Sequence, residues 1–134
     1  MRHRLRILIA DDDRDAASTL AMLLRDCGDE VLTVLRGDEA LEICRLFRPD
    51  VVISDINMPG ESGYAIAREL RDRHRELAPF LIAMSGVWTN ASDRSVGRAA
   101  GFDHYMLKPC DPHELAQLIE PLRTGLPRPQ AEVK

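Results

Sequence analysis

Three consecutive carboxylates, Asp11, Asp12 and Asp13, follow a short apolar run in the stretch ILIADDD. Carboxylates this close repel one another, and in a poorly hydrated place the repulsion raises the pKa of at least one of them. The pattern therefore predicts that a cation, or a proton, is held at this point of the chain. Asp13 also stands where the N-cap of a following helix is expected.

Other polar side chains stand where further apolar runs end. Asp55 follows VVIS, Ser85 follows FLIAM, and Lys108 follows YML. Ligands of open parallel sheets bind beyond the carboxyl ends of the strands, so we expect these three residues to meet the first acids on one edge. A solvated acidic turn followed by a helix cap is the alternative, and it leaves this coincidence of strand ends unexplained.

The residue types indicate the chemistry of such an edge. Carboxylates without histidine or cysteine suit Mg²⁺, or Mn²⁺ in its place, rather than zinc. The four histidines, at positions 3, 74, 104 and 113, have no ligand spacing and are expected on the surface. A lysine and a hydroxyl beside a metal can neutralise the oxygens of a phosphoryl group. An aspartate there can itself accept that group as an aspartyl-phosphate.

Alternating apolar runs and amphipathic segments must position these residues. Apolar runs typical of strands, some unbroken and some weaker, lie at 7–10, 31–35, 51–54, 80–84 and 105–107. Apolar residues recur at helical spacing within 16–27, 40–47, 66–70, 96–100 and 115–122. Asp111 and Pro112 are typical of the start of the last helix. The alternation predicts an α/β domain, a flavodoxin-like, doubly wound (βα)5 fold whose five-stranded parallel sheet has the order 2-1-3-4-5.

Length and composition indicate one domain. We expect it to cover residues 1–122, with a flexible tail or linker at 123–134, where RTGLPRPQAEVK has few apolar residues. A net charge of −4 argues against direct nucleic-acid binding. No apolar run is long enough for a signal peptide or membrane span, so a cytoplasmic location is expected.

The three cysteines have no CxxC spacing, which favours reduced thiols. Cys27 and Cys44 fall on apolar helical positions and are expected in the core, as small buried residues. Cys110 follows Lys108-Pro109 in an expected loop, where a redox role is a minor alternative.

Four motifs together resemble the receiver domain of two-component response regulators, of the kind found in chemotaxis regulators and hybrid histidine kinases. ILIADDD resembles the family's acidic pair, DINMPGESG its phosphoacceptor loop and AMSG its Ser/Thr switch. AAGFDHYMLKP resembles the segment with an aromatic switch and a Lys-Pro pair. The similarity covers about residues 5–122.

The resemblance implies a role for each motif residue. Asp55 would be the phosphorylated aspartate, and Mg²⁺ would be bound by Asp11, Asp12, Asp55 and the backbone carbonyl of Asn57. The phosphoryl group would be bound and sensed by Ser85, Lys108 and Tyr105, the ring that turns inward, while the loops would be shaped by Pro59, Gly63 and Pro109. The Lys108–Pro109 peptide bond would be cis.

The resemblance also concerns how long the phosphoryl group lasts. The residues two after the acceptor and two after the switch, Asn57 and Val87, would set this lifetime. Because an apolar Val87 cannot orient a water molecule, we expect a state that is not especially short-lived. Gly86 would loosen the switch loop, and Trp88 beside it is either a packing residue or one whose surroundings respond to metal and phosphate.

By this resemblance the chain is a phosphorylation switch that assists its own phosphorylation and dephosphorylation. A sensor histidine kinase or phosphotransfer protein would donate to Asp55, and the face of the fourth helix, fifth strand and fifth helix would then control a protein partner. One alternative is a small Mg²⁺-dependent phosphatase with an aspartyl-phosphate intermediate, which leaves Asp55 without a role. Another is a receiver that serves only as an interaction module. Whether the receiver stands alone or comes from a hybrid kinase stays open.

Overall fold

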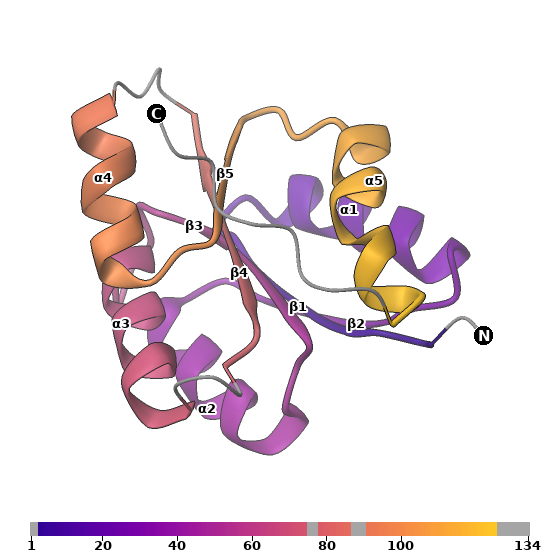
Figure 1. Ribbon diagram of the computed structural model, residues 1–134, viewed down its shortest axis with the longest axis horizontal. Helices are drawn as coiled ribbons and strands as arrows, with labels where there is room; N and C mark the ends of the chain where they lie inside the picture. The colour runs from indigo at the N-terminus through magenta and orange to yellow at the C-terminus, as the bar shows by residue number, and fades with distance from the viewer. Residues whose placement is uncertain (1–2, 75–77, 87–90, 126–134) are drawn as a thin grey trace.

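The computed structural model describes residues 3–74, 78–86 and 91–125. Five strands alternate with five helices among these residues (Figure 1): β1 (Arg6–Ala10), α1 (Arg14–Asp26), β2 (Glu30–Val34), α2 (Gly37–Phe47), β3 (Val51–Asp55), α3 (Gly63–His74), β4 (Phe80–Ser85), α4 (Ala91–Ala100), β5 (His104–Leu107) and α5 (Pro112–Arg123). All strand pairs are parallel, in the order β2-β1-β3-β4-β5, which confirms the predicted flavodoxin-like sheet.

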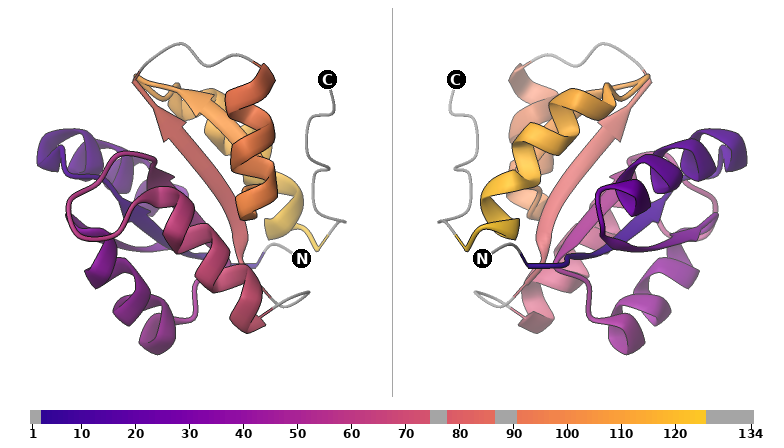
Figure 2. Two further views of the ribbon diagram at one scale, coloured as in Figure 1. Left: turned by 90° about the vertical axis from the view of Figure 1, so that its left-hand side faces the viewer. Right: turned by 90° about the vertical axis from the view of Figure 1, so that its right-hand side faces the viewer.

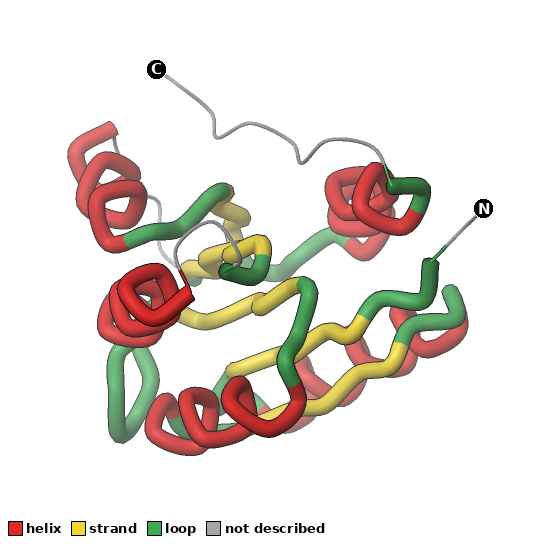
Figure 3. Tube along the Cα trace, turned by 60° about the horizontal axis from the view of Figure 1, so that its bottom comes forward, coloured by secondary structure: helices red, strands yellow, loops and turns green. Residues whose placement is uncertain are grey.

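The sheet is buried on both faces because successive side chains of a strand point to opposite sides. Ile7 and Ile9 of β1 pack with α1 and α5, whereas Leu8 and Ala10 pack with α2, α3 and the end of α4. Figure 2 shows α2, α3 and α4 in front in one view and α1 and α5 in front in the other. Figure 3 follows the strands as one twisted layer with helices on both sides. This double cover explains the unbroken apolar runs of the central strands.

The cysteines follow the sequence expectation only in part. Cys44 is buried in the α2–α3 side of the core, as predicted. The prediction for Cys27 is wrong, because this residue is the C-cap of α1 and is exposed. Its spacing continues the apolar stripe of the helix, but the helix ends before the stripe reaches it.

The last helix is fixed by a buried ion pair. α5 ends at Arg123, one residue beyond the expected domain boundary, and the Arg123 side chain is only 2% exposed. Its guanidinium donates to both carboxylate oxygens of Asp29 and, at 2.8 Å, to Glu120. Asp29 also accepts a bond from the Leu5 N–H at 3.3 Å. The turn before β2, the chain entering β1 and the end of α5 therefore meet at one buried charge pair.

Removing one partner of this pair is expected to destabilise the fold. In Arg123→Ala, the Asp29 carboxylate stays buried without its counter-charge, which costs about 3–5 kcal/mol of unfolding free energy. Urea unfolding followed by circular dichroism measures the loss. Arg45→Ala is the matched control, because the Arg45–Glu42 pair is exposed and contributes at most about 1 kcal/mol. Equal effects of the two substitutions would contradict the prediction.

The cysteines should differ in their reactivity toward an alkylating reagent. Burial raises the pKa of the Cys44 thiol to about 12, and burial together with Glu114 and Asp111 raises the pKa of Cys110 to about 11. Since the thiolate is the nucleophile, iodoacetamide at about pH 8 should modify the exposed Cys27 first. Peptide mapping against time checks the order. Raising the pH toward 11 should accelerate the alkylation of Cys110. Alkylation of Cys44 before Cys27 would contradict the burial of Cys44.

Candidate functional site

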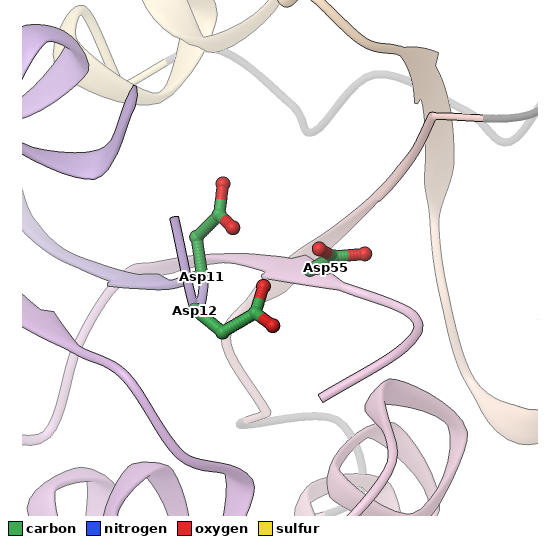
Figure 4. A group of neighbouring side chains, drawn as sticks. All are labelled: Asp11, Asp12 and Asp55. Carbon is green, nitrogen blue, oxygen red and sulfur yellow. The ribbon is translucent and has the colours of Figure 1, made fainter. Parts of the chain in front are cut away.

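The carboxyl ends of β1 and β3 bring three carboxylates together. Asp11 and Asp12 follow the last residue of β1, and Asp55 is the last residue of β3. One carboxylate oxygen from each lies within 4.8 Å of the others, and this is the group of metal-ligating side chains found among the described residues. Figure 4 shows the three side chains projecting into one space beyond the two strands. Asp11 and Asp55 are buried and Asp12 is exposed, so the cluster opens to solvent on one side.

Lys108 places its ammonium group between two of these carboxylates. Its Nζ lies 2.7 Å from Asp55 Oδ2 and 3.0 Å from Asp11 Oδ1. Partial burial alone would lower the pKa of Lys108, but the bonds to Asp55 and Asp11 outweigh it and raise the pKa above its usual value. The lysine therefore stays charged through the physiological pH range and offsets part of the repulsion among the acids.

Backbone contacts orient the acids. The Asp11 carboxylate accepts the Asp13 N–H at 3.0 Å, and Asp13 in turn caps α1 by accepting the Ala16 N–H at 3.2 Å. The predicted N-cap is thus confirmed. The Asp55 carboxylate accepts the Asn57 N–H at 3.2 Å. Each buried carboxylate consequently has one oxygen bonded to its own turn, and this bond holds the side chain at the strand end.

The loop between Asp55 and α3 is held closely against the sheet. The Gly63 N–H donates to the Ile56 carbonyl at 2.8 Å, and a Cβ at Gly63 would lie 2.5 Å from the Asp55 carbonyl oxygen. Only glycine permits this approach. Pro59 is exposed, and its carbonyl accepts the Gly37 N–H at 3.0 Å. Pro59 thus lies in the loop that the two residues were expected to shape, and Gly63 begins α3 at the end of this loop.

Gly37 is a residue of this site that the sequence analysis missed. A Cβ at Gly37 would lie 1.9 Å from the carbonyl oxygen of Glu61, so residue 37 must be glycine for the loop after β3 to pass this close to the start of α2. A glycine at the start of a helical pattern was a visible signal. This signal did not show which segment approaches Gly37, because Glu61 follows only after α2 and β3 in the chain.

The remaining site residues come from β4 and β5. Ser85 ends β4, is buried, and accepts the Lys108 backbone N–H on its carbonyl at 2.7 Å. The Lys108–Pro109 bond is cis, as the resemblance implied. Tyr105 is half-buried on β5, where its hydroxyl lies 3.2 Å from the hydroxyl of Tyr64. Val87 and Trp88 lie outside the described residues, as does the expected tail from residue 126 onward.

The donor set fits a hard divalent cation. Three carboxylates that converge without a histidine or cysteine match the oxygen ligands preferred by Mg²⁺. Among the described residues, no helix is long and apolar enough to cross a membrane.

Comparison with known proteins agrees with this geometry. A family model described as the response regulator receiver domain matches residues 7–120. The transcriptional regulatory protein PrrA of Mycobacterium tuberculosis is 34% identical over 123 residues, which are 92% of this chain and 50% of PrrA. The DNA-binding response regulator MtrA of Mycobacterium leprae is 36% identical over 116 residues, which are 87% of this chain and 50% of MtrA.

The solved structures give the same family. The chemotaxis response regulator CheY4 of Vibrio cholerae has a TM-score of 0.78 and 28% identity, over 85% of this chain and 94% of CheY4. The chain spans about half the length of the curated relatives it matches. From the family model, these relatives and the parallel sheet, the chain belongs to the response regulator receiver domain family of two-component systems.

Proposed function

We propose that Asp55 accepts a phosphoryl group from the phosphohistidine of a sensor histidine kinase or a phosphotransfer protein. The observation that carries the proposal is the contact between Asp55 Oδ2 and Lys108 Nζ, 2.7 Å long, beside Asp11 and Asp12. A nucleophilic carboxylate, a fixed cation and two further acids thus occupy one strand edge. Phosphoryl transfer depends mainly on such positioning and charge.

Mg²⁺ is the proposed cofactor. Asp11, Asp12 and Asp55 would hold it with the backbone carbonyl of Asn57, and Mn²⁺ would bind the same oxygen ligands. When bound, the ion neutralises charge on the transferring phosphoryl group. The bonds from Asn57 N–H and Lys108 Nζ to Asp55 orient its carboxylate before the reaction.

In the transfer step, a carboxylate oxygen of Asp55 attacks the phosphorus of the donor phosphohistidine. The P–O bond forms as the P–N bond breaks, and the imidazole leaves with the electron pair of that bond. The Lys108 ammonium stabilises the oxygens of the transferring group, and the Ser85 hydroxyl would bind one of them. Later attack of water on phosphorus releases inorganic phosphate and restores the Asp55 carboxylate.

The surface beside Asp55 offers room for a phosphodonor protein. A groove of about 520 Å³ runs between α1 and the loop after β5, and it includes Asp11 and Lys108. Its apolar lining comes from Ala16, Leu20 and Leu23 on one side and from Pro109 and Cys110 on the other. A groove with apolar walls that also includes Asp11 and Lys108 supports docking of a helix that carries the donor histidine close to Asp55.

The output is proposed to be a protein partner that contacts the face of α4, β5 and α5. Exposed apolar side chains on this face, Val96 and Leu107, support such a contact. Tyr105 on β5 would connect the face to Ser85 and the phosphoryl group, so that phosphorylation shifts an existing conformational equilibrium. We propose no direct contact of this chain with nucleic acid or membrane, which is consistent with its formal net charge of −4.

The phosphatase alternative is less well supported. It would place the nucleophile among Asp11, Asp12 and Asp13, of which Asp13 caps α1, and it would leave Asp55 without a role. Asp55 has the shorter contact with the lysine and the bond from the loop N–H. These contacts favour Asp55 as the nucleophile.

Phosphorylation by a small donor tests the proposal. Incubation with Mg²⁺ and acetyl phosphate should add one phosphoryl group to the wild type, seen as intact mass, because the charges that assist transfer belong to the receiver itself. Asp55→Asn should gain none, and a chelator should abolish the gain. A gain in Asp55→Asn would move the nucleophile to the acids after β1. Turnover of a phosphomonoester would favour the phosphatase.

Metal binding tests the acid cluster separately. Asp12→Asn removes one of three carboxylates and should raise the dissociation constant for Mg²⁺ at least about tenfold, because a full charge near the ion is lost. Titration calorimetry measures it. Asp13→Asn is the matched control: asparagine is an equally good N-cap, so the affinity should change little. Equal effects of the two substitutions would argue that only the summed charge of the loop matters.

A further inference from the structure

Two tyrosines join the helix after the acceptor loop to the last strand. Tyr64 lies in the first turn of α3 and Tyr105 on β5, and their hydroxyl oxygens are 3.2 Å apart. Both side chains are half-buried, and both rings contact Phe102 edge to face, at 6.3 and 6.2 Å between ring centroids. The two hydroxyl groups thus lie beside packed aromatic rings, where loss of a hydrogen bond costs more free energy than at an open surface.

The tyrosine on α3 is tied to the phosphoacceptor through the backbone. Its neighbour Gly63 donates to the Ile56 carbonyl at 2.8 Å and approaches the Asp55 carbonyl so closely that no Cβ would fit. Tyr64 therefore lies in a first helical turn that is in direct contact with the end of β3. A change in the backbone at Asp55 would move Tyr64 relative to Tyr105.

We propose that Tyr64 is a positioning residue, whose hydroxyl holds the Tyr105 ring in the orientation that belongs to the free Asp55 carboxylate. In this arrangement the Lys108 ammonium is bonded directly to an Asp55 oxygen while the two tyrosine hydroxyls are paired. The inference rests on the proposed function, because it assigns Tyr105 a change of orientation on phosphorylation. It adds a second route from Asp55 to Tyr105, through α3, besides the one through Ser85.

Linkage gives the direction of the effect. A hydrogen bond that stabilises one conformation lowers the affinity of any ligand that prefers the other conformation. Removing the bond should therefore raise that affinity. Tyr64→Phe keeps the ring and its packing on Phe102 but removes the bond between the hydroxyls. Beryllofluoride with Mg²⁺, a mimic of the phosphoryl group, should then bind about two- to tenfold more tightly, the range expected for one hydrogen bond.

The two tyrosines of the chain make a direct measurement simple. A protein labelled only in its tyrosine rings gives NMR signals from Tyr64 and Tyr105 alone, and Tyr64→Phe leaves only those of Tyr105. Before any addition, the Tyr105 signals of Tyr64→Phe should already be displaced toward the position that beryllofluoride produces in the wild type. Titration with beryllofluoride at saturating Mg²⁺ then gives the affinity of each variant. Asp55→Asn, which lacks the acceptor, should not respond.

A double-mutant cycle separates the hydroxyl pair from a merely structural role. If the hydroxyls act on each other, Tyr64→Phe should have no further effect on beryllofluoride affinity in a Tyr105→Phe background. Unchanged Tyr105 signals, or unchanged or weakened affinity in Tyr64→Phe, would overturn the inference while the wild-type response still supported Asp55 as acceptor. A wild type that does not respond to beryllofluoride would overturn both the proposed function and the coupling built on it.

Discussion

Repulsion among Asp11, Asp12 and Asp55 is the constraint on which the rest of the structure depends. Three carboxylates with oxygens within 4.8 Å of one another oppose folding unless a cation offsets them. The described part of the site supplies one such cation, the Lys108 ammonium, which lies 97 and 53 residues away from its two partners in sequence. The Lys108 side chain is held at this place by the pairing of β5 with β4 and by the bond from the Lys108 backbone N–H to the Ser85 carbonyl. Formation of the complete sheet therefore brings in the positive charge that offsets the repulsion among the three acids.

The loop between β3 and α3 is constrained in a different way, by close backbone contact. Gly37 and Gly63 let the residues between β3 and α3 lie directly against the start of α2 and the end of β3. The Pro59 carbonyl is fixed by the Gly37 N–H, and the Ile56 carbonyl by the Gly63 N–H. The proposed role of Tyr64 depends on these contacts, because they would pass a shift at Asp55 to the first turn of α3.

Much of the fold and the candidate site followed from the sequence, for a definite physical reason. Parallel strands covered on both faces read as unbroken apolar runs, and their carboxyl ends share one edge, so Asp11, Asp55 and Lys108 could be placed together without coordinates. The buried Asp29–Arg123 pair could not, because its partners are 94 residues apart and single charged residues have no periodic signal. The Glu61 approach to Gly37 and the Tyr64–Tyr105 contact were missed because no sequence pattern links residues that meet only in the folded chain. Cys27 was misplaced because periodicity does not mark where a helix ends.

The short strand β5 connects the two functional ends of the domain. Tyr105 packs against the α2–α3–α4 side of the sheet, Met106 against the α1–α5 side, and Lys108 follows at the acid cluster. A ligand that pulls on Lys108 therefore acts on the strand that carries the proposed switch ring. Reversing a two-state equilibrium almost completely requires about 5.5 kcal/mol of differential binding, whereas one hydrogen bond contributes about 1 kcal/mol. A change of about 1 kcal/mol shifts such an equilibrium only about fivefold, so the proposed loss of the Tyr64–Tyr105 bond would displace the Tyr105 equilibrium without completing the change.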